Sequence, residues 1–463
     1  MRVLLISTYE LGRQPVHVAS PAARLARSGH QVSTLDLAVE GLTPGSLADV
    51  DAVAISVPMH TAMRLAVSTS TIIRDLAPDL PIAFYGLYAG VGQTHTLGGA
   101  ADRLIAGEYE TGLDAWVTSL SSGVTADTGN TSFLPPLRST LPPLSSYAHL
   151  EWEGEARVVG AVEASHGCRH RCRHCPIPVV YDGRWRAVGQ EVVLADIAAQ
   201  VAAGAEHITF GDPDFLNAPR YSMGILNEAH AAHPNLSFDV TVKVSHLLQH
   251  REIVAEMARS GVLFIVSAFE SVHEPTLEIL AKNHTVADMV DAIDLVRGTG
   301  AHLRPTWLPF LPWTEVGDVV SLIDFLDAHL LWEATDPVQL AIKLLIPEGS
   351  LLESHPAVLP HLIGYRPETL GWDWRFADPA AGALQEKLSG IAEESSDCGA
   401  EAAETLAGMA GVIAAATGRP ERRLSSGPDV PRLSESWFCC AEPTSAQTIS
   451  LSATSVTVPA LDS

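Results

Sequence analysis

The sequence is short of basic residues. It has 29 Lys and Arg against 54 Asp and Glu, which gives a formal net charge of −25. A chain with this balance repels a phosphate backbone, so we expect no nucleic-acid partner. No run of 18 or more uncharged apolar residues is present, so we expect no membrane partner either. The first seven residues indicate a strand and not a signal peptide, because no small-residue cleavage site follows them, and a cytoplasmic location is expected.

Cysteines are also few. The chain has six in 463 residues; three lie in one short stretch, Cys398 is alone, and two are adjacent near the carboxyl end. This clustering fits metal binding in a reducing cytosol better than a disulfide framework. We interpret Cys398 as structural. An apolar content of 47% supports two or three domains with substantial cores.

The clustered cysteines follow a strand-like run over residues 157–164. They are Cys168, Cys172 and Cys175, in the pattern Cys-x3-Cys-x2-Cys. So short a loop can bring three thiolates to one metal–sulfur centre, and with no fourth cysteine nearby one iron would stay open. Thiolates select zinc or iron–sulfur chemistry. The alternative is a Cys₃His zinc site completed by an interleaved histidine. The candidates are His166, His170 and His174.

Cys-x3-Cys-x2-Cys at the head of an α/β domain resembles the signature of radical SAM enzymes. In that family the open iron binds S-adenosylmethionine, and an injected electron cleaves it to a 5′-deoxyadenosyl radical. The resemblance implies a [4Fe–4S] cluster on the three cysteines, a small-molecule substrate and an electron donor such as flavodoxin or ferredoxin. His174 occupies the position where the family has an aromatic residue near the adenine.

Strand and helix patterns alternate through residues 1–120. This predicts a parallel, doubly wound, Rossmann-like sheet, which binds ligands at the carboxyl ends of its strands. The segment resembles the cobalamin-binding domain that precedes many radical SAM domains, through the motifs Ser-Gly-His-Gln-Val, Ser-Val-Pro, Gly-Leu-Tyr-Ala-Gly and Ala-Gly-Glu-Tyr-Glu. The cofactor contacts implied by this resemblance are Ser56, Gly86, Gly107 and Glu108.

The same segment has no Asp-x-His-x-x-Gly motif. Any bound cobalamin would therefore lack a lower histidine ligand. His17 and His60 are loop histidines, and we interpret both as structural or facing solvent. A flavodoxin-like domain without a cofactor, or one that has lost it, is the alternative.

Residues 121–154 form a linker rich in Ser and Pro, with two Pro-Pro pairs that favour extended chain. From 155 to 350 the alternation resumes, with about six strands that fit a partial (β/α)6 barrel whose reactive centre lies at the strand carboxyl ends. The radical SAM resemblance assigns S-adenosylmethionine contacts to polar residues at these ends, although each could also be an ordinary loop cap. They are Gly211, Asp212, Asp214, Lys243, Ser245 and Glu270.

Residues 351–418 contain two helix patterns and are expected to form a helical extension. The composition of residues 419–463 turns to Ser, Pro and Thr and predicts a mobile tail. Within it, Cys439 and Cys440 are adjacent, and vicinal thiols chelate soft centres or shuttle through a disulfide. Cys-Cys-Ala-Glu-Pro resembles the tail of the CUAEP/CCAEP-tail radical SAM proteins, where the second position can be selenocysteine. This implies a catalytic role for the pair; a dispensable tail is the alternative.

The leading hypothesis is a radical SAM enzyme that methylates an unactivated carbon of a small metabolite with cobalamin. A second hypothesis is alkylation or redox handling of an arsenic or selenium substrate held by the tail thiols. A third, from another functional class, is a zinc-stabilised binding protein without turnover.

Overall fold

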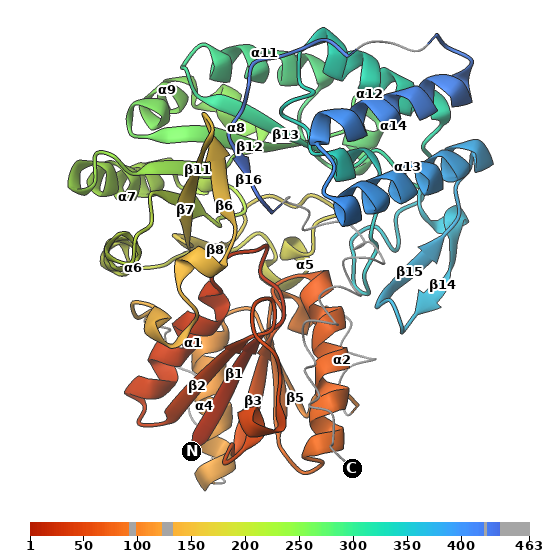
Figure 1. Ribbon diagram of the computed structural model, residues 1–463. Helices are drawn as coiled ribbons and strands as arrows, with labels where there is room; N and C mark the ends of the chain where they lie inside the picture. Colours follow the sequence, from red (N-terminus) through yellow and green to blue (C-terminus); the bar gives the residue numbers. More distant parts are fainter. Residues whose placement is uncertain (92–98, 123–132, 421–423, 436–463) are drawn as a thin grey trace.

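The computed structural model describes residues 1–91, 99–122, 133–420 and 424–435. It has two α/β parts, an N-terminal open sheet and a curled half-barrel stacked on it (Figure 1). The predicted α/β fold, with a Rossmann-like sheet followed by a partial barrel, is confirmed. No helix in the described ranges combines the length and apolar character that a membrane crossing needs.

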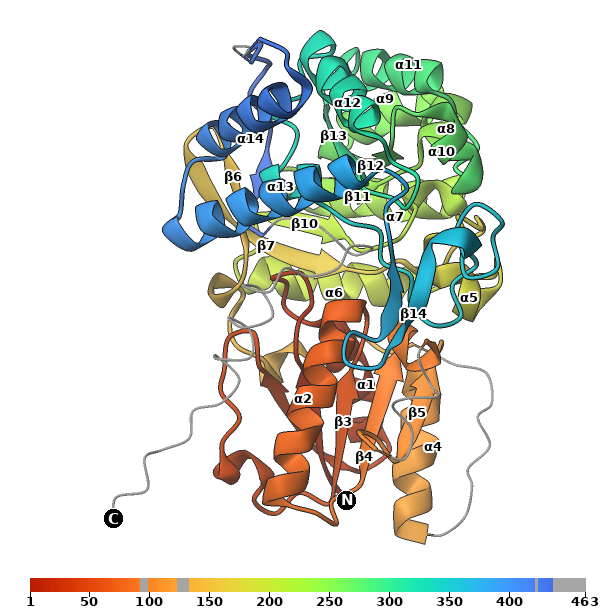
Figure 2. The same ribbon diagram turned by 90° about the vertical axis from the view of Figure 1, so that its right-hand side faces the viewer.

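The N-terminal sheet has five parallel strands in the order β2-β1-β3-β4-β5. Helices α1 and α4 pack on one face and α2 on the other, so each face has its own apolar core. Figure 2 shows α2 in front of the sheet. The strands are β1 (Arg2–Ser7), β2 (Gln31–Asp36), β3 (Ala52–Ser56), β4 (Ile82–Gly86) and β5 (Arg103–Ala106); the helices are α1 (Val16–Arg27), α2 (His60–Leu76) and α4 (Tyr109–Ser122).

Strand burial explains why this sheet forms. Every residue of β3 and β4 is buried, as expected for central parallel strands covered on both faces. Short 3-10 turns lie between these elements: η1 (Pro44–Leu47) and η2 (Leu87–Gly90), which directly follows β4. Because the five strands are parallel, their carboxyl ends lie at one edge of the sheet. This edge faces the half-barrel (Figure 1).

The half-barrel sheet has the order β13-β12-β11-β10-β7-β6-β16. Strands β7, β10, β11, β12 and β13 are parallel to one another. Strands β6 and β16 are antiparallel additions at the β7 edge. A large apolar core joins the sheet to the surrounding helices. The strands are β6 (His149–Trp152), β7 (Glu155–Val162), β10 (His207–Phe210), β11 (Ser237–Thr241), β12 (Val262–Glu270), β13 (His302–Trp307) and β16 (Arg432–Leu433).

Helices cover the outside of this sheet in the usual βα alternation (Figure 1). They are α6 (Gln190–Ala202), α7 (Pro219–Ala232), α8 (Val244–Gln249), α9 (Arg251–Arg259), α10 (Glu274–Ile279), α11 (Val286–Arg297) and α12 (Val316–Ala328). A small hairpin of β8 (Ser165–Gly167) and β9 (Trp185–Ala187) encloses α5 (Ile177–Tyr181), and the 3-10 turn η5 (Phe215–Asn217) precedes α7.

The sixth barrel strand expected near residues 338–345 is not a strand. The segment begins with the 3-10 turn η6 (Pro337–Leu340) and makes only an isolated bridge between Lys343 and Phe310. The backbone N–H of Trp307, at the end of β13, donates instead to the side-chain Oε1 of Gln339 at 3.1 Å. A side chain thus takes the place of the ladder partner that a sixth strand would supply.

Residues 133–154, which the sequence places in a linker, are firmly held. Besides β6 they contain the turns η3 (Arg138–Thr140) and η4 (Leu144–Ser146). Arg138 makes a bidentate pair with Asp196 of α6, at 2.6 and 2.8 Å, and also donates to the Ala161 carbonyl. This buried pairing fixes the connection between the two parts.

The C-terminal extension packs on the half-barrel. It consists of the 3-10 turn η7 (Leu359–His361), the hairpin β14 (Leu362–Arg366) and β15 (Gly371–Trp374), and the helices α13 (Pro379–Cys398) and α14 (Ala402–Thr417). The hairpin descends toward the N-terminal part (Figure 2), where His60 Nε2 lies 2.7 Å from the Thr369 carbonyl. His60 is buried and structural, as the sequence interpretation allowed.

Composition predicts a mobile tail beyond Gly418, but residues 424–435 pack on the molecule. Arg432 and Leu433 form β16, which pairs with β6. Glu435 then accepts a hydrogen bond from the Tyr9 hydroxyl at 2.5 Å. The Cys439–Cys440 pair lies outside the described residues.

Candidate active site

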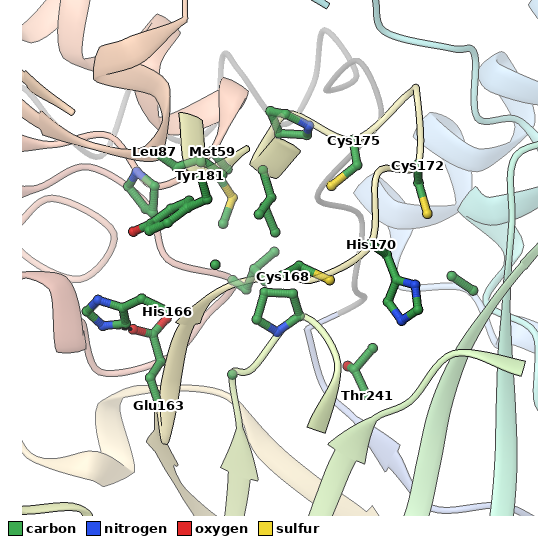
Figure 3. A pocket seen from close by; sticks show the side chains of 18 of the residues that line it. Met59, Leu87, Glu163, His166, Cys168, His170, Cys172, Cys175, Tyr181 and Thr241 are labelled. Carbon is green, nitrogen blue, oxygen red and sulfur yellow. Dashed lines mark ion pairs between the residues drawn. The ribbon is translucent and has the colours of Figure 1, made fainter. Parts of the chain in front are cut away.

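A cavity of about 280 Å³ lies between the carboxyl ends of the two sheets. On the N-terminal side it is lined by loops after β1, β3, β4 and β5, and on the other side by the cysteine loop and the ends of β10 to β13. Figure 3 shows side chains of this lining. Sheets of these two kinds bind ligands at the carboxyl ends of their strands, and here the strand ends of both parts face the same cavity.

The three clustered cysteines all line this cavity. Their loop leaves β8 at Gly167, whose φ is +75° and whose added Cβ would lie 2.3 Å from the Arg184 carbonyl oxygen, so the turn requires glycine. Cys168 and Cys172 are buried and Cys175 is partly buried. Burial raises the pKa of the Cys168 thiol to about 11, despite contacts from the His170 backbone and Asn217.

The donor set fits an iron–sulfur cluster with one open position. Three thiols share the cavity, and the only other cysteine in the described ranges, Cys398, is exposed on α13. The interleaved histidines that could complete a Cys₃His zinc site face other partners. His166 lies between Glu108 and Glu163, His170 beside Asp214, and His174 beside Glu270.

Two buried lysines stand next to the cysteine loop. Lys243 Nζ lies 3.5 Å from Cys172 Sγ. Lys282, which sequence reasoning missed, places Nζ 2.9 Å from Glu270 Oε1. Burial alone would lower the pKa of Lys282, but Glu270 and then Cys172 raise it above the ordinary value. This positive charge favours thiolates and an anionic cluster.

Glu270 ends β12 in a left-handed conformation with φ +67°, at a bulge in the pairing with β13. Its Oε1 lies 3.1 Å from His174 Nε2 as well as beside Lys282. Burial would raise the pKa of this carboxyl, but Lys282 and His174 outweigh burial and lower it. The cavity wall therefore holds an ionised carboxylate between the Lys282 ammonium and the His174 imidazole.

Only part of the predicted S-adenosylmethionine contacts line the cavity. Those that do are His174, Gly211, Lys243 and Glu270. Asp212 turns to the backbone N–H of Ala164 and the Ser165 hydroxyl, and Asp214 turns to His170 and His246. Ser245 lies within α8 and is not among the residues that line the cavity. The side chains of Asp212 and Asp214 thus contact other elements, and a role for these three residues in cofactor binding stays a prediction.

On the N-terminal side the cavity wall is largely apolar. Its apolar residues include Leu11, Val16, Met59, Leu87 and Tyr88. Of the predicted cobalamin contacts, Gly107 lines the cavity. Ser56 and Gly86 end strands below the lining, and Glu108 lies beside His166 and Arg186.

A chain of alternating carboxylates and imidazoles crosses between the two parts. It runs Glu10–His17–Glu163–His166–Glu108, with N···O separations of 3.1, 3.4, 3.3 and 3.3 Å in that order. Burial alone would lower the pKa of His17, but Glu163 and Glu10 raise it to about 9. His17, interpreted as structural or facing solvent, is instead part of the cavity wall.

Residues 162–323 match the Radical SAM superfamily. No curated protein matches the chain. In structure it is similar to "Cobalamin-dependent S-adenosylmethionine radical enzyme OxsB with aqua-cobalamin bound", with 15% identity and a TM-score of 0.63 over 85% of this chain and 67% of that one. It is also similar to "radical S-adenosylmethionine methyltransferase, TsrM, from Kitasatospora setae with cobalamin and [4Fe-4S] cluster bound", with 17% identity and a TM-score of 0.53 over 71% and 70% of the two chains.

At these identities the structural likenesses establish a shared fold, and the chain spans about two thirds of the length of OxsB. The superfamily match carries the chemistry, because it covers the strand ends that line the cavity. A radical SAM domain implies a [4Fe–4S] cluster, S-adenosylmethionine, a small-molecule substrate and a reductant. The chain is thus an enzyme whose residues 162–323 form a radical SAM domain.

Proposed function

We propose that this enzyme reductively cleaves S-adenosylmethionine and methylates a carbon of a small metabolite with the help of cobalamin. The observation that carries the proposal is the single cavity that joins the three cysteines to the carboxyl edge of the Rossmann-like sheet. Two cofactors with one substrate between them need such a shared space. The likeness in fold to OxsB and TsrM, two enzymes whose structures contain bound cobalamin, supports the same assignment.

Within this proposal the half-barrel binds the charged groups. Cys168, Cys172 and Cys175 would hold three irons of the cluster. The Lys243 ammonium suits the carboxylate of the methionyl group, and the Glu270 carboxylate suits its ammonium. His174 offers a flat ring to the adenine and also helps to keep Glu270 ionised.

The N-terminal side would bind a corrin by shape. Its apolar residues can cover a macrocycle face and exclude water, and Gly107, with φ +72°, lets the backbone approach closely. Among the described residues that line the cavity on this side, His17 is the only histidine, and its Nδ1 lies 3.1 Å from Glu10 Oε1. When bound, the cofactors supply reductive cleavage and methyl transfer; the residues named here bind, orient and exclude water.

The test is anaerobic reconstitution of the full chain, with flavodoxin or ferredoxin as the proposed electron donor. We expect about four iron atoms per chain, one bound cobalamin, and release of 5′-deoxyadenosine or S-adenosylhomocysteine when a reductant and S-adenosylmethionine are added. A colourless protein that carries zinc on its three thiols would contradict the radical SAM assignment. A brown protein without cobalamin would contradict only the cobalamin part.

A second candidate function concerns the tail thiols. Glu435 is held by Tyr9, and an added Cβ on Gly12 would lie 2.8 Å from the Glu435 Cβ. Tyr9 and Gly12 flank Glu10 and Leu11, which line the cavity. The chain therefore leaves its last described residue beside the cavity. We propose that Cys439 and Cys440 act there, holding a thiophilic arsenic or selenium substrate or serving as a redox pair.

Cys440→Ser tests this candidate. We expect the variant to keep its iron and to cleave S-adenosylmethionine, but to lose the alkylated product when arsenite or selenite is offered as substrate. Thr444→Ser, a change of one methyl group four residues further along the same segment, serves as the control and should keep the product. Equal product from Cys440→Ser and the control would make the thiol dispensable.

A further inference from the structure

Three potential metal ligands converge next to the cysteine loop. His170 lies in that loop between Cys168 and Cys172, Asp214 follows β10, and His246 lies in α8. Asp214 Oδ2 is 2.7 Å from His246 Nδ1 and 3.2 Å from His170 Nε2. All three ligand atoms lie within 4.8 Å of one another.

These atoms approach one another at ion-pair distances in a buried position. The Asp214 side chain is completely buried, and Asp214 Oδ2, His170 Nε2 and His246 Nδ1 are buried with no partner in hydrogen-bond geometry. A hydrogen bond needs the N–H to point at its acceptor. Buried polar atoms without such a bond are costly. Three buried ligand atoms this close together can share a metal ion, which would satisfy all of them at once.

The remaining contacts of the site leave these atoms available. Asp214 Oδ1 accepts the backbone N–H of Leu216 at 3.2 Å, which fixes the carboxylate and frees Oδ2. The two imidazole rings have centroids 4.6 Å apart and are tilted by 58°, so they are not stacked face to face. His250 is the next ring, 5.8 Å from His246. One buried carboxylate and two imidazole rings together offer the oxygen and nitrogen ligands that a cation needs.

We propose that His170, Asp214 and His246 bind one divalent transition-metal ion, separate from the cluster held by the cysteines. Two imidazoles and a carboxylate are a set that zinc and ferrous iron accept, with at least one position left for water or another ligand. The ion ties the cysteine loop to the end of β10 and to α8. Its role is to position the loop, because its ligands come from three separate elements.

Zinc is the probe. The full chain is reconstituted with iron and sulfide without oxygen, exposed to one equivalent of Zn²⁺ and freed of loose metal by gel filtration. We expect one retained zinc per chain in addition to the cluster iron. X-ray absorption at the zinc edge should show nitrogen and oxygen ligands at about 2.0–2.1 Å. No retained zinc, or a shell with sulfur at about 2.3 Å, would overturn the proposal.

Matched histidine variants locate the ion. His246→Ala should weaken zinc binding by at least about tenfold while keeping the iron content. His250→Ala removes the neighbouring ring on the same segment and should retain zinc. Equal zinc affinity in the two variants would refute the site. If His246→Ala fails to fold, the absorption spectrum of the unmodified enzyme still decides. No readout depends on S-adenosylmethionine cleavage, so this test is independent of the proposed function.

Discussion

The half-barrel side of the cavity and the N-terminal side differ in how they can hold a ligand. The half-barrel presents thiols, lysines and a carboxylate, and three of these groups come from one loop of eight residues. The N-terminal side presents mainly apolar side chains and backbone from four separate loops, with Glu10, Arg13 and His17 as its charged or titratable members. The first side specifies its ligand by chemical identity and the second by shape. A ligand held by chemistry is lost when one atom type changes, whereas a ligand held by shape is lost when the space is filled.

The largest loss of activity is expected from a substitution on the half-barrel side of the cavity. Cys172→Ala removes a cluster ligand and should lower 5′-deoxyadenosine formation by roughly 100-fold or more. Iron content and the absorbance near 400 nm, characteristic of the cluster, provide the measurement. Cys398→Ala, on the exposed part of α13, is the matched control and should leave both unchanged. Unchanged cleavage of S-adenosylmethionine by Cys172→Ala would show that the half-barrel side does not depend on the chemical identity of its ligands.

The next effect comes from the buried charge of Glu270. Glu270→Gln leaves the Lys282 ammonium buried without its partner, so the free energy of unfolding should fall by about 3 kcal/mol. Urea unfolding followed by circular dichroism measures the change. Adding Lys282→Met should recover part of the loss, because the unpaired charge is then gone. Glu278→Gln, an exposed neighbour on α10, should shift stability by less than about 0.5 kcal/mol.

A smaller effect on ligand binding is expected from a substitution on the N-terminal side of the cavity. Leu87→Trp fills the apolar wall and should weaken cobalamin binding about tenfold, because overpacking displaces the ligand. Iron content and S-adenosylmethionine cleavage should not change. Leu76→Trp, at a position 48% exposed on α2, is the control. If Leu87→Trp instead lowered the iron content, the two sides would not be separable.

The smallest effect concerns the carboxylate–imidazole chain that links the two sides. The pKa of His17 is raised to about 9, so its stabilisation is complete below about pH 6.5, the usual histidine value, and is lost as the pH rises through 9. The pKa of Glu163 is lowered to about 2, mainly by His17 and His166 against the effect of burial, so its contribution is lost as the pH falls through 2.

We expect the free energy of unfolding to decrease by on the order of 1 kcal/mol between pH 6.5 and 9. His17→Gln should flatten this part of the profile, and His149→Gln, a half-exposed histidine on β6, should not. A profile that stays steep in His17→Gln would assign the titration to another group.

Much of the fold and the centre of the site could be predicted from the sequence. The alternation of apolar strands and helices is local, and so is the cysteine spacing. Lys282 could not be found, because no short-range pattern places it opposite Glu270; only the curl of the sheet does so. Asp214 illustrates the opposite case. Its position after β10 suggested a cofactor contact, but the side chain turns toward His246, which lies on the next βα unit.

The hydrogen bond between Tyr9 and Glu435 fixes a point from which the reach of the following residues can be calculated. Covalent geometry allows at most about 3.6 Å per residue. Cys439 follows Glu435 by four residues and Cys440 by five, so their α-carbons stay within roughly 14 and 18 Å of the Glu435 α-carbon. Under the proposed role of the tail thiols, so short a tether would let them act beside the β1–α1 loop without a separate docking segment.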